Sequence, residues 1–209
     1  IIIHADSGNT TTTSGTLLTR QGGESNNRLP RRRGFCSMRF GKDQVHQHEA
    51  PALKAALAKH GIDLFVAAPK RGEDISRVVF EALALSDFFI AFATPTYAED
   101  TGNPACTYNE LQYWRTTVQP KAKKKGVTKP IIPIRMLKEG EEFETSRPGV
   151  LLAEVLFGSN LSYVEWPLGS TRNADGTTTV PESLVKDVVD AAAPPPPIRN
   201  RGTGFSLSV

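Results

Sequence analysis

The chain has 209 residues, of which 39% are hydrophobic, and this is enough for one sizeable folded core. Its formal net charge of +3 is mild, so the composition does not indicate a nucleic-acid-binding protein. The sequence has no apolar run of about 18 residues, so we expect no membrane-spanning segment. The two cysteines, Cys36 and Cys106, are far apart in the sequence, which is typical of a reduced, cytoplasmic protein rather than a disulfide framework.

The two ends of the chain differ in composition from its middle. Residues 1–33 are rich in Gly, Ser, Thr and Asn and show no periodicity, so we predict a disordered leader. Residues 194–209 begin with four prolines and predict an extended linker and tail. Residues 34–193 remain as one folded domain. Because the first residue is not Met, we expect the chain to be a piece of a longer protein.

Short apolar segments alternate with helical patterns along this domain. Residues 87–93 (DFFIAFA) are apolar on both faces, which is typical of a parallel strand covered by helices on each side. We expect Pro120 to end one helix, and Pro133 to mark a strand end or an irregularity. The patterns predict strands over 34–40, 62–67, 87–93, 130–136 and 161–166, and helices over 49–60, 74–85, 108–119, 149–157 and 181–193.

This alternation predicts an α/β fold. Right-handed crossovers and a sheet of this size favour a flavodoxin-like three-layer sandwich, with a five-stranded, mainly parallel sheet in the order 2-1-3-4-5. In such folds, ligands bind outside the carboxyl ends of the strands. The loops 39–48, 68–74 and 94–107 reach that edge, together with the segment after Met136. Glu110 begins the helix after the third of these loops, so chain order places its carboxyl group at the expected crevice.

Glu110 also has a purely structural explanation. Thr107-x-x-Glu110 is the pattern of a capping box, in which Glu at the third helical position bonds back to the N–H group of the cap. That geometry would favour an ionised carboxylate. From the spacing alone, both a cap and a catalytic carboxylate stay open. His46 and His48 have no third ligand nearby, so we expect no metal site.

Six segments in this order resemble the TIR (Toll/interleukin-1 receptor) domain family. The first, FCSMRFG, resembles the family's first conserved motif (its first box), and its SMRFG sequence is similar to that of a subgroup found in single-celled eukaryotes. The likeness runs from about Gly34 to Leu168, roughly two thirds of the chain. The other five segments are PALKAALAKHGIDLFV (51–66), PKRGEDI (69–75, like the BB loop), EALALSDFFIAFATPTYAED (81–100), CTYNEL (106–111) and YVEW (163–166).

The resemblance implies a function. Some TIR domains hydrolyse NAD+ at the nicotinamide–ribose bond and depend on the glutamate that opens this helix, so that role falls to Glu110. NAD+ is then a substrate, and no bound cofactor is expected. The implied partners are other TIR domains in a homo-oligomer. The candidates for contacts with the substrate are Arg39, Lys70 and Arg71 for the phosphates, and Phe40, Tyr97, Tyr108 and Trp114 for stacking on a ring.

The alternative is a signalling scaffold without catalysis. It would pair with other TIR domains through residues 68–74 and the neighbouring helices. A phospho-acceptor receiver is a weaker alternative, because that class needs an Asp at the end of the first strand, where this chain has Ser37, Met38 and Arg39.

Overall fold

The structure, a computed structural model, describes residues 32–68, 74–158 and 163–193. The predicted tail from Pro194, the predicted leader before Arg32, and the loop that carries Lys70 and Arg71 lie outside these residues. None of the helices within the described ranges has the length and hydrophobicity that are needed to cross a membrane.

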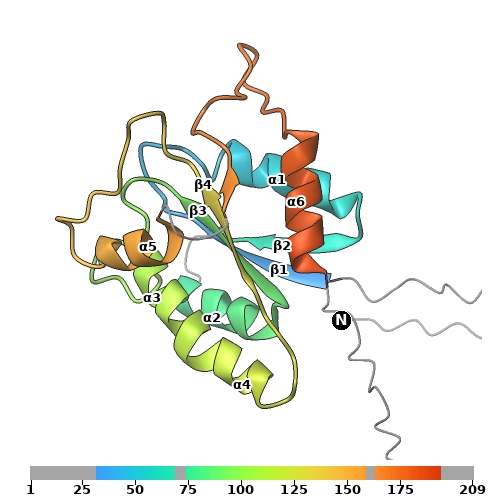
Figure 1. The fold of residues 1–209 in the computed structure, drawn as a ribbon, viewed down its shortest axis with the longest axis vertical. Helices are drawn as coiled ribbons and strands as arrows, with labels where there is room; N and C mark the ends of the chain where they lie inside the picture. The colour runs from blue at the N-terminus through green and yellow to red at the C-terminus, as the bar shows by residue number, and fades with distance from the viewer. Residues whose placement is uncertain (1–31, 69–73, 159–162, 194–209) are drawn as a thin grey trace, which may run out of the picture.

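The five strands form one sheet in the order β2-β1-β3-β4-β5, and every neighbouring pair is parallel. The predicted α/β flavodoxin-like winding is therefore confirmed (Figure 1). The strands are β1 (Arg32–Ser37), β2 (Ile62–Val66), β3 (Phe88–Ala93), β4 (Ile131–Arg135) and β5 (Val164–Glu165). The helices are α1 (Glu49–Ala58), α2 (Ile75–Leu85), α3 (Thr107–Tyr113), α4 (Gln119–Lys123), α5 (Val150–Phe157) and α6 (Glu182–Ala192), with a π-helical turn η1 (Trp114–Val118) between α3 and α4.

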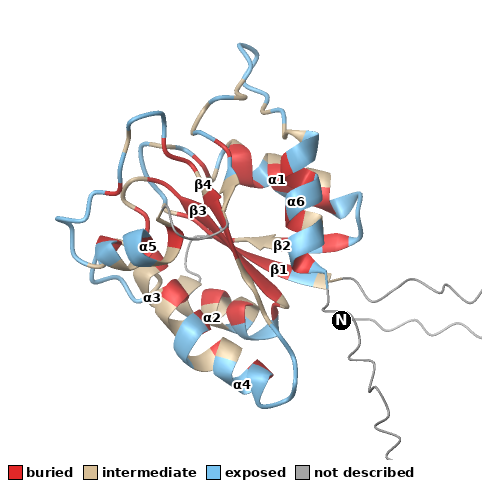
Figure 2. Ribbon diagram, in the orientation of Figure 1, coloured by how far each residue is buried: buried red, intermediate tan, exposed pale blue. Residues whose placement is uncertain are grey.

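Helices cover both faces of the sheet. Helices α1 and α6 lie on one face, while α2, α3, α4 and α5 lie on the other (Figure 1). The three central strands β1, β3 and β4 are mostly buried between these layers, as the red segments in Figure 2 show, whereas the edge strands β2 and β5 are partly exposed. Strand β3 is the clearest case, because all six of its residues are buried. Alternate residues of β3 enter the two cores, as expected for a strand that helices cover on each side.

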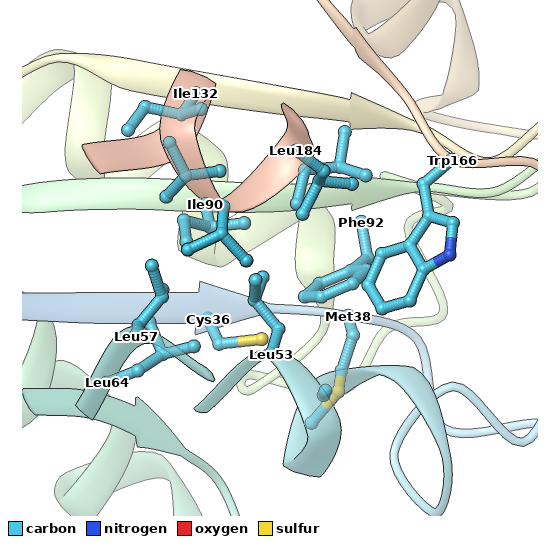
Figure 3. Close-up of a cluster of buried hydrophobic side chains, with 14 of the residues drawn as sticks. Cys36, Met38, Leu53, Leu57, Leu64, Ile90, Phe92, Ile132, Trp166 and Leu184 are labelled. Atoms are coloured by element: carbon cyan, nitrogen blue, oxygen red, sulfur yellow. The ribbon is translucent and has the colours of Figure 1, made fainter. Parts of the chain in front are cut away.

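The core beneath α1 and α6 contains aliphatic side chains and two sulfur-containing ones. Leu53 and Leu57 of α1 and Leu184 of α6 pack against Ile90 and Ile132 of the sheet (Figure 3). The labelled residues of this core also include Cys36, Met38, Leu64, Phe92 and Trp166.

Two boundaries differ from the predictions. Strand β1 begins at Arg32, so Arg32 and Arg33 belong to the folded domain and not to the leader. Both residues pair with neighbouring strands: the carbonyl oxygen of Arg33 accepts a hydrogen bond from the amide of Asp87 at 2.7 Å, and Arg32 pairs with Ile62 of β2. At the other end, β5 is shorter than predicted and lies at the edge of the sheet.

Pro120 does not end its helix, which was the expectation. It lies in the first turn of α4, directly after the π-helical turn η1. An internal proline removes a helical hydrogen bond and clashes with the carbonyl group four residues earlier. In η1 the N–H group of Gln119 bonds instead to the oxygen of Trp114, five residues back, and this wider turn accommodates the proline ring.

Pro133 lies inside β4, opposite Ala91 of β3. The amide of Met136 bonds to β3, while the carbonyl group of Arg135 accepts from Trp166 beyond β5. In a parallel strand the two directions alternate, so the nitrogen of Pro133 faces the β5 side. Pairing with β5 starts only at Ile134, so the missing N–H group removes no bond from the sheet.

Candidate functional site

Glu110 lies in the first turn of α3 and is only 6% exposed. Its carboxyl group points toward the end of β1, where the hydroxyl group of Ser37 donates a hydrogen bond of 2.5 Å to Oε2. Ser37 in turn accepts a hydrogen bond of 2.8 Å from the phenol of Tyr97. Three buried polar side chains from three separate segments therefore form one chain: Tyr97 to Ser37 to Glu110.

The alternation of side chains along β1 explains why Ser37 meets Glu110. Cys36 and Met38 enter the core beneath α1 and α6, whereas Phe35 enters the opposite core. Ser37 has the same orientation as Phe35 because successive side chains of a strand point to opposite faces. As the last residue of β1, Ser37 is at the carboxyl end of the sheet, on the side where α3 begins.

Burial sets the charge state of this chain of side chains. Removal from water raises the pKa of Glu110 to about 8, and the hydrogen bond from Ser37 partly opposes that rise. The pKa of Tyr97 is raised as well, chiefly by burial and further by Glu110, against the hydrogen bond to Ser37. Burial also raises the pKa of the Cys36 thiol. At neutral pH the Glu110 carboxyl group is therefore mostly protonated.

The capping box that the Thr107-x-x-Glu110 spacing left open is not formed. The helix begins at Thr107 itself, and the hydroxyl group of Thr107 accepts from the amide of Ala98 at 3.0 Å. The amide of Glu110 donates to the carbonyl oxygen of Cys106 at 3.1 Å, as in an ordinary helical turn. The side chain of Glu110 reaches β1 instead of the cap, and burial there favours its neutral form rather than the ionised form that a cap would favour.

Two hollows at the carboxyl edge of the sheet are both lined by Arg39 and Phe40. The larger of these two has a volume of about 290 Å³ and is completed by the loop after β3 and by the segment after β4. The smaller, of about 180 Å³, is closed by residues 99–107 and includes Cys106 and Thr107 at the start of α3. Glu110 lines neither of these two hollows.

Ion pairs fix the wall between these hollows. Arg39 forms an ion pair with Glu99 and reaches the carbonyl oxygen of Thr96 at 3.5 Å. Glu99 also pairs with Arg147 at 3.2 Å, and Arg147 pairs with Glu144. The loop after β3 is thereby joined to the segment after β4. An anion that approaches Arg39 must compete with Glu99 for it.

The structure separates the other predicted site residues into two groups. Phe40 is 44% exposed, and its ring lies 5.0 Å from that of His46, so one aromatic surface is accessible at the hollows. Tyr108 is partly exposed in the first turn of α3, where its hydroxyl group accepts from Gln112 at 3.2 Å. Lys70 and Arg71 lie outside the described residues.

The remaining two aromatic residues are in the core. Trp114 is 0% exposed and packs against Phe89 with ring centroids 5.4 Å apart. Tyr97 is also fully buried and packs against Phe157 at 5.9 Å. Neither ring offers a face on which a ligand can stack, so that prediction is wrong for both. Tyr97 stays at the site through its hydroxyl group alone.

Sequence reasoning missed the partners of the predicted residues. No local sequence pattern singles out Ser37, Glu99 or Arg147 as a site residue. The position of Ser37 at the end of a central strand is a signal that identifies it, because that position faces the ligand crevice in this winding. The contact of Glu99 with Arg147 depends on how two loops pack, which no local pattern predicts.

The strand order and the buried carboxyl group define the class: a flavodoxin-like α/β domain with a candidate carboxylate site at the carboxyl edge of its sheet. No protein-family model matches the chain, and no curated protein is similar to it in sequence.

Two solved structures share part of its arrangement. One is the TIR domains of the activated Roq1 resistosome that directly recognizes the pathogen effector XopQ, with 16% identity and a TM-score of 0.45, covering 76% of this chain and 98% of that one. The other is the CMP N-glycosidase BcmB of Clostridium botulinum, with 17% identity and a TM-score of 0.37, covering 65% of this chain and 88% of that one. Since both TM-scores are below 0.5, the fold assignment rests on the strand order and pairing of this chain.

Proposed function

We propose that this chain is a TIR-domain signalling protein that cleaves NAD+ at the nicotinamide–ribose bond through Glu110 when copies of it self-associate. One observation carries the proposal: the carboxyl group of Glu110 is held at the carboxyl edge of the sheet by Ser37 of the SMRFG motif. Two of the six family-like segments, FCSMRFG and CTYNEL, thus meet at a single hydrogen bond. The order of the six segments supports the same assignment, and so does the strand order.

The chemistry needs only one carboxylate. When the bond between ribose C1′ and the pyridinium nitrogen breaks, the bond electrons go to the nitrogen and nicotinamide leaves as a neutral molecule. No general acid has to protonate the leaving group, in contrast to ordinary glycosidases, which use two carboxyl groups. Ionised Glu110 would bind the ribose hydroxyl groups and stabilise the oxocarbenium charge, or attack it as a nucleophile. Water then adds to C1′ to give ADP-ribose and a proton.

In the isolated chain this carboxyl group is buried and, with a pKa of about 8, mostly protonated at neutral pH. Catalysis therefore requires that the Glu110 carboxyl group become exposed to substrate and ionised. Exposure to water lowers its pKa toward the ordinary value, and this permits ionisation at neutral pH. We propose that self-association exposes Glu110 in this way. Arg39 would then contact a phosphate group, and Phe40 and Tyr108 would stack on a ring of NAD+. Lys70 and Arg71 stay candidates for phosphate contacts.

The decisive experiment is to incubate the 209-residue chain with NAD+ over a range of protein concentrations and to measure nicotinamide release. We expect release that rises more than proportionally with protein concentration and is lost in Glu110→Gln, which keeps the shape of the side chain. Glu182→Gln, on the exposed first turn of α6, is the matched control and should retain full turnover. Equal turnover in Glu110→Gln and in the unaltered chain would refute the catalytic assignment.

A second candidate, a TIR scaffold without catalysis, is favoured by the same burial. Glu110 is almost inaccessible and hydrogen-bonded, so it also fits a purely structural polar residue of the core. This candidate predicts self-association that survives Glu110→Gln, with no nicotinamide released by either protein. We place either protein in the cytoplasm, because its cysteines, Cys36 and Cys106, are both free thiols.

A further inference from the structure

The last residues of α4 and the loop that follows it form a turn of one charge sign, which we call the lysine turn (residues 121–129). It carries Lys121, Lys123, Lys124, Lys125 and Lys129 and has no acidic residue. The first four lysines are exposed, and within the described residues none of them forms an ion pair. Beside them, the apolar side chain of Val127 is 51% exposed. The lysine turn therefore presents a hydrophobic tip among unpaired cations.

The backbone holds this turn in one shape. Gly126 has a φ of +72°, and its amide donates to the carbonyl oxygen of Lys123 at 3.0 Å. The amide of Val127 reaches back to Ala122 at 3.0 Å, which completes a Schellman motif at the end of α4. At the other end of the turn, the ammonium group of Lys129 donates to the carbonyl oxygen of Ser86 at 2.5 Å. A loop that is already ordered loses little conformational entropy when it binds.

A hollow of opposite charge lies beyond the carboxyl ends of β4 and β5. We call it the acidic hollow; its volume is about 400 Å³. It is lined by four glutamates (Glu139, Glu141, Glu142 and Glu165), by two cations (Arg135 and Lys138), and by the apolar side chains of Leu137 and Pro167. Arg135 is already engaged, because it donates to the hydroxyl group of Tyr163 at 3.1 Å. The hollow thus carries more negative than positive side chains, together with some apolar surface.

The lysine turn and the acidic hollow are at opposite ends of strand β4. The turn leads into the strand and the hollow follows it, as the path of the chain from α4 through β4 shows (Figure 1). The two surfaces cannot meet within one copy, although they are complementary in charge. We propose that they meet between copies: the lysine turn of one copy inserts into the acidic hollow of the next, head to tail.

This proposal names the surfaces for the self-association on which the proposed function depends. Because the two surfaces differ, the contact is heterologous. After each copy is added, the assembly still has a free lysine turn at one end and a free acidic hollow at the other. The assembly therefore grows as an open chain or closes as a ring. We favour this contact over binding of the lysine turn to lipid or nucleic acid, because the chain itself supplies a hollow of opposite charge.

The acidic hollow also adjoins the candidate site. Glu141 lines both the acidic hollow and the larger hollow that contains Arg39 and Phe40. In the same segment, the amide of Glu144 donates to Pro95 at 2.8 Å, which ties it to the loop after β3. A copy seated in the acidic hollow therefore contacts Glu141, which also lines the hollow of Arg39 and Phe40. This shared wall is a physical route by which assembly reaches the surface around Arg39.

Charge reversal with complementation tests the proposal. One variant, Lys124→Glu/Lys125→Glu, reverses the turn, and another, Glu139→Lys/Glu142→Lys, reverses the hollow. We expect each alone to self-associate at least about tenfold more weakly in sedimentation velocity at low salt, because like charges then face each other. Mixed in equal amounts, the two variants should associate again, since the reversed turn of one matches the reversed hollow of the other. Lys54→Glu/Lys59→Glu, exposed on α1 and at its C-terminal cap, is the control with the same change in net charge as the turn variant and should associate normally.

Three results would overturn the proposal: an unaltered chain that stays monomeric, reversed variants that associate as the unaltered chain does, or a mixture that fails to recover while both variants keep their circular dichroism. Loss of binding to anionic vesicles or to RNA by the turn variant, with self-association unchanged, would overturn it in favour of those partners. Nicotinamide release is measured separately in the same samples. Association through these surfaces without any release would refute the NAD+ assignment alone.

Discussion

Ser37 and Glu110 are 73 residues apart in the sequence and are joined by a buried hydrogen bond of 2.5 Å. Two opposing effects act on the carboxyl group at this point. Burial favours its neutral form, while the hydroxyl group of Ser37 favours the charged form, and burial dominates because the pKa stays near 8. The bond therefore positions the Glu110 carboxyl group, while burial favours its neutral form.

The raised pKa of Glu110 predicts how stability depends on pH. Between the ordinary value of 4.5 and about 8, the folded chain retains a proton that the unfolded chain releases. The free energy of unfolding should then fall with rising pH, by up to about 1.4 kcal/mol per pH unit for one such group. This contribution is fully present below pH 4.5 and is lost as pH rises through 8. In Glu110→Gln the contribution is absent, so its stability should fall less over this range.

Urea unfolding at a series of pH values measures the effect directly. Glu182→Gln removes an exposed carboxylate at the start of α6 and should leave the pH dependence of the unaltered chain in place. The same pH dependence in Glu110→Gln as in the unaltered chain would show that Glu110 titrates in the folded protein as it does in the unfolded one.

Removal of the Ser37 hydroxyl group should raise the pKa of Glu110 further. In Ser37→Ala the donor that lowers this pKa is gone, and the phenol of Tyr97 loses its acceptor. We expect a loss of about 1–3 kcal/mol in the free energy of unfolding, because buried polar groups are left without partners. Tyr97→Phe keeps the bond between Ser37 and Glu110 and should change the pKa less. The carbon-13 NMR shift of the Glu110 carboxyl carbon follows the titration, and a lower pKa in Ser37→Ala would contradict the assigned hydrogen bond.

The winding of the sheet could be predicted because its signal is local. Every residue of β3 is apolar, and such a strand must be covered on both faces, which requires helices between parallel strands. The same reasoning placed Glu110 at the carboxyl edge. It could not identify the partner of Glu110, because Thr107-x-x-Glu110 offers a local hydrogen bond that the folded chain replaces with one to a residue of β1.

The errors at Trp114 and Pro120 have different physical sources. Trp114 lies three residues after the buried Leu111, which places it on the core face of the helix, where it packs against Phe89. Pro120 follows the π-helical turn η1, which admits the proline without ending the helix. Helical patterns assume a regular period of 3.6 residues, so they do not predict such a turn or the end of the helix beyond it.

Gly149 should tolerate no side chain. It has a φ of +87°, and a Cβ atom built on it would lie 2.4 Å from the carbonyl oxygen of Ala98. We expect Gly149→Ala to lower the free energy of unfolding by more than the roughly 1–2 kcal/mol of a left-handed residue alone, because the backbone of the loop must also move. Gly126→Ala is a matched control, since its φ is +72° and nothing lies within 4 Å of the added atom. Equal losses in the two variants, measured by urea unfolding, would show that the loop yields freely.

We expect Glu49 and Arg172 to stabilise the fold as a pair, so that the loss of one partner lowers the free energy of unfolding more than the loss of both. Glu49 is 1% exposed and accepts from Arg172 through Nε at 2.7 Å and Nη2 at 2.8 Å, which joins α1 to the loop before α6. Arg172→Met leaves an unpaired buried carboxylate and should cost about 3–5 kcal/mol of unfolding free energy.

Glu49→Gln in addition removes that charge, so the double variant should recover a large part of the loss. A double-mutant cycle by urea unfolding at pH 7 measures the coupling between the two residues. If the losses of the two single variants simply add in the double variant, the two side chains do not stabilise the fold as a pair. Lys186→Met, which removes an exposed ion pair with Asp190 on α6, is the control and should cost far less than Arg172→Met.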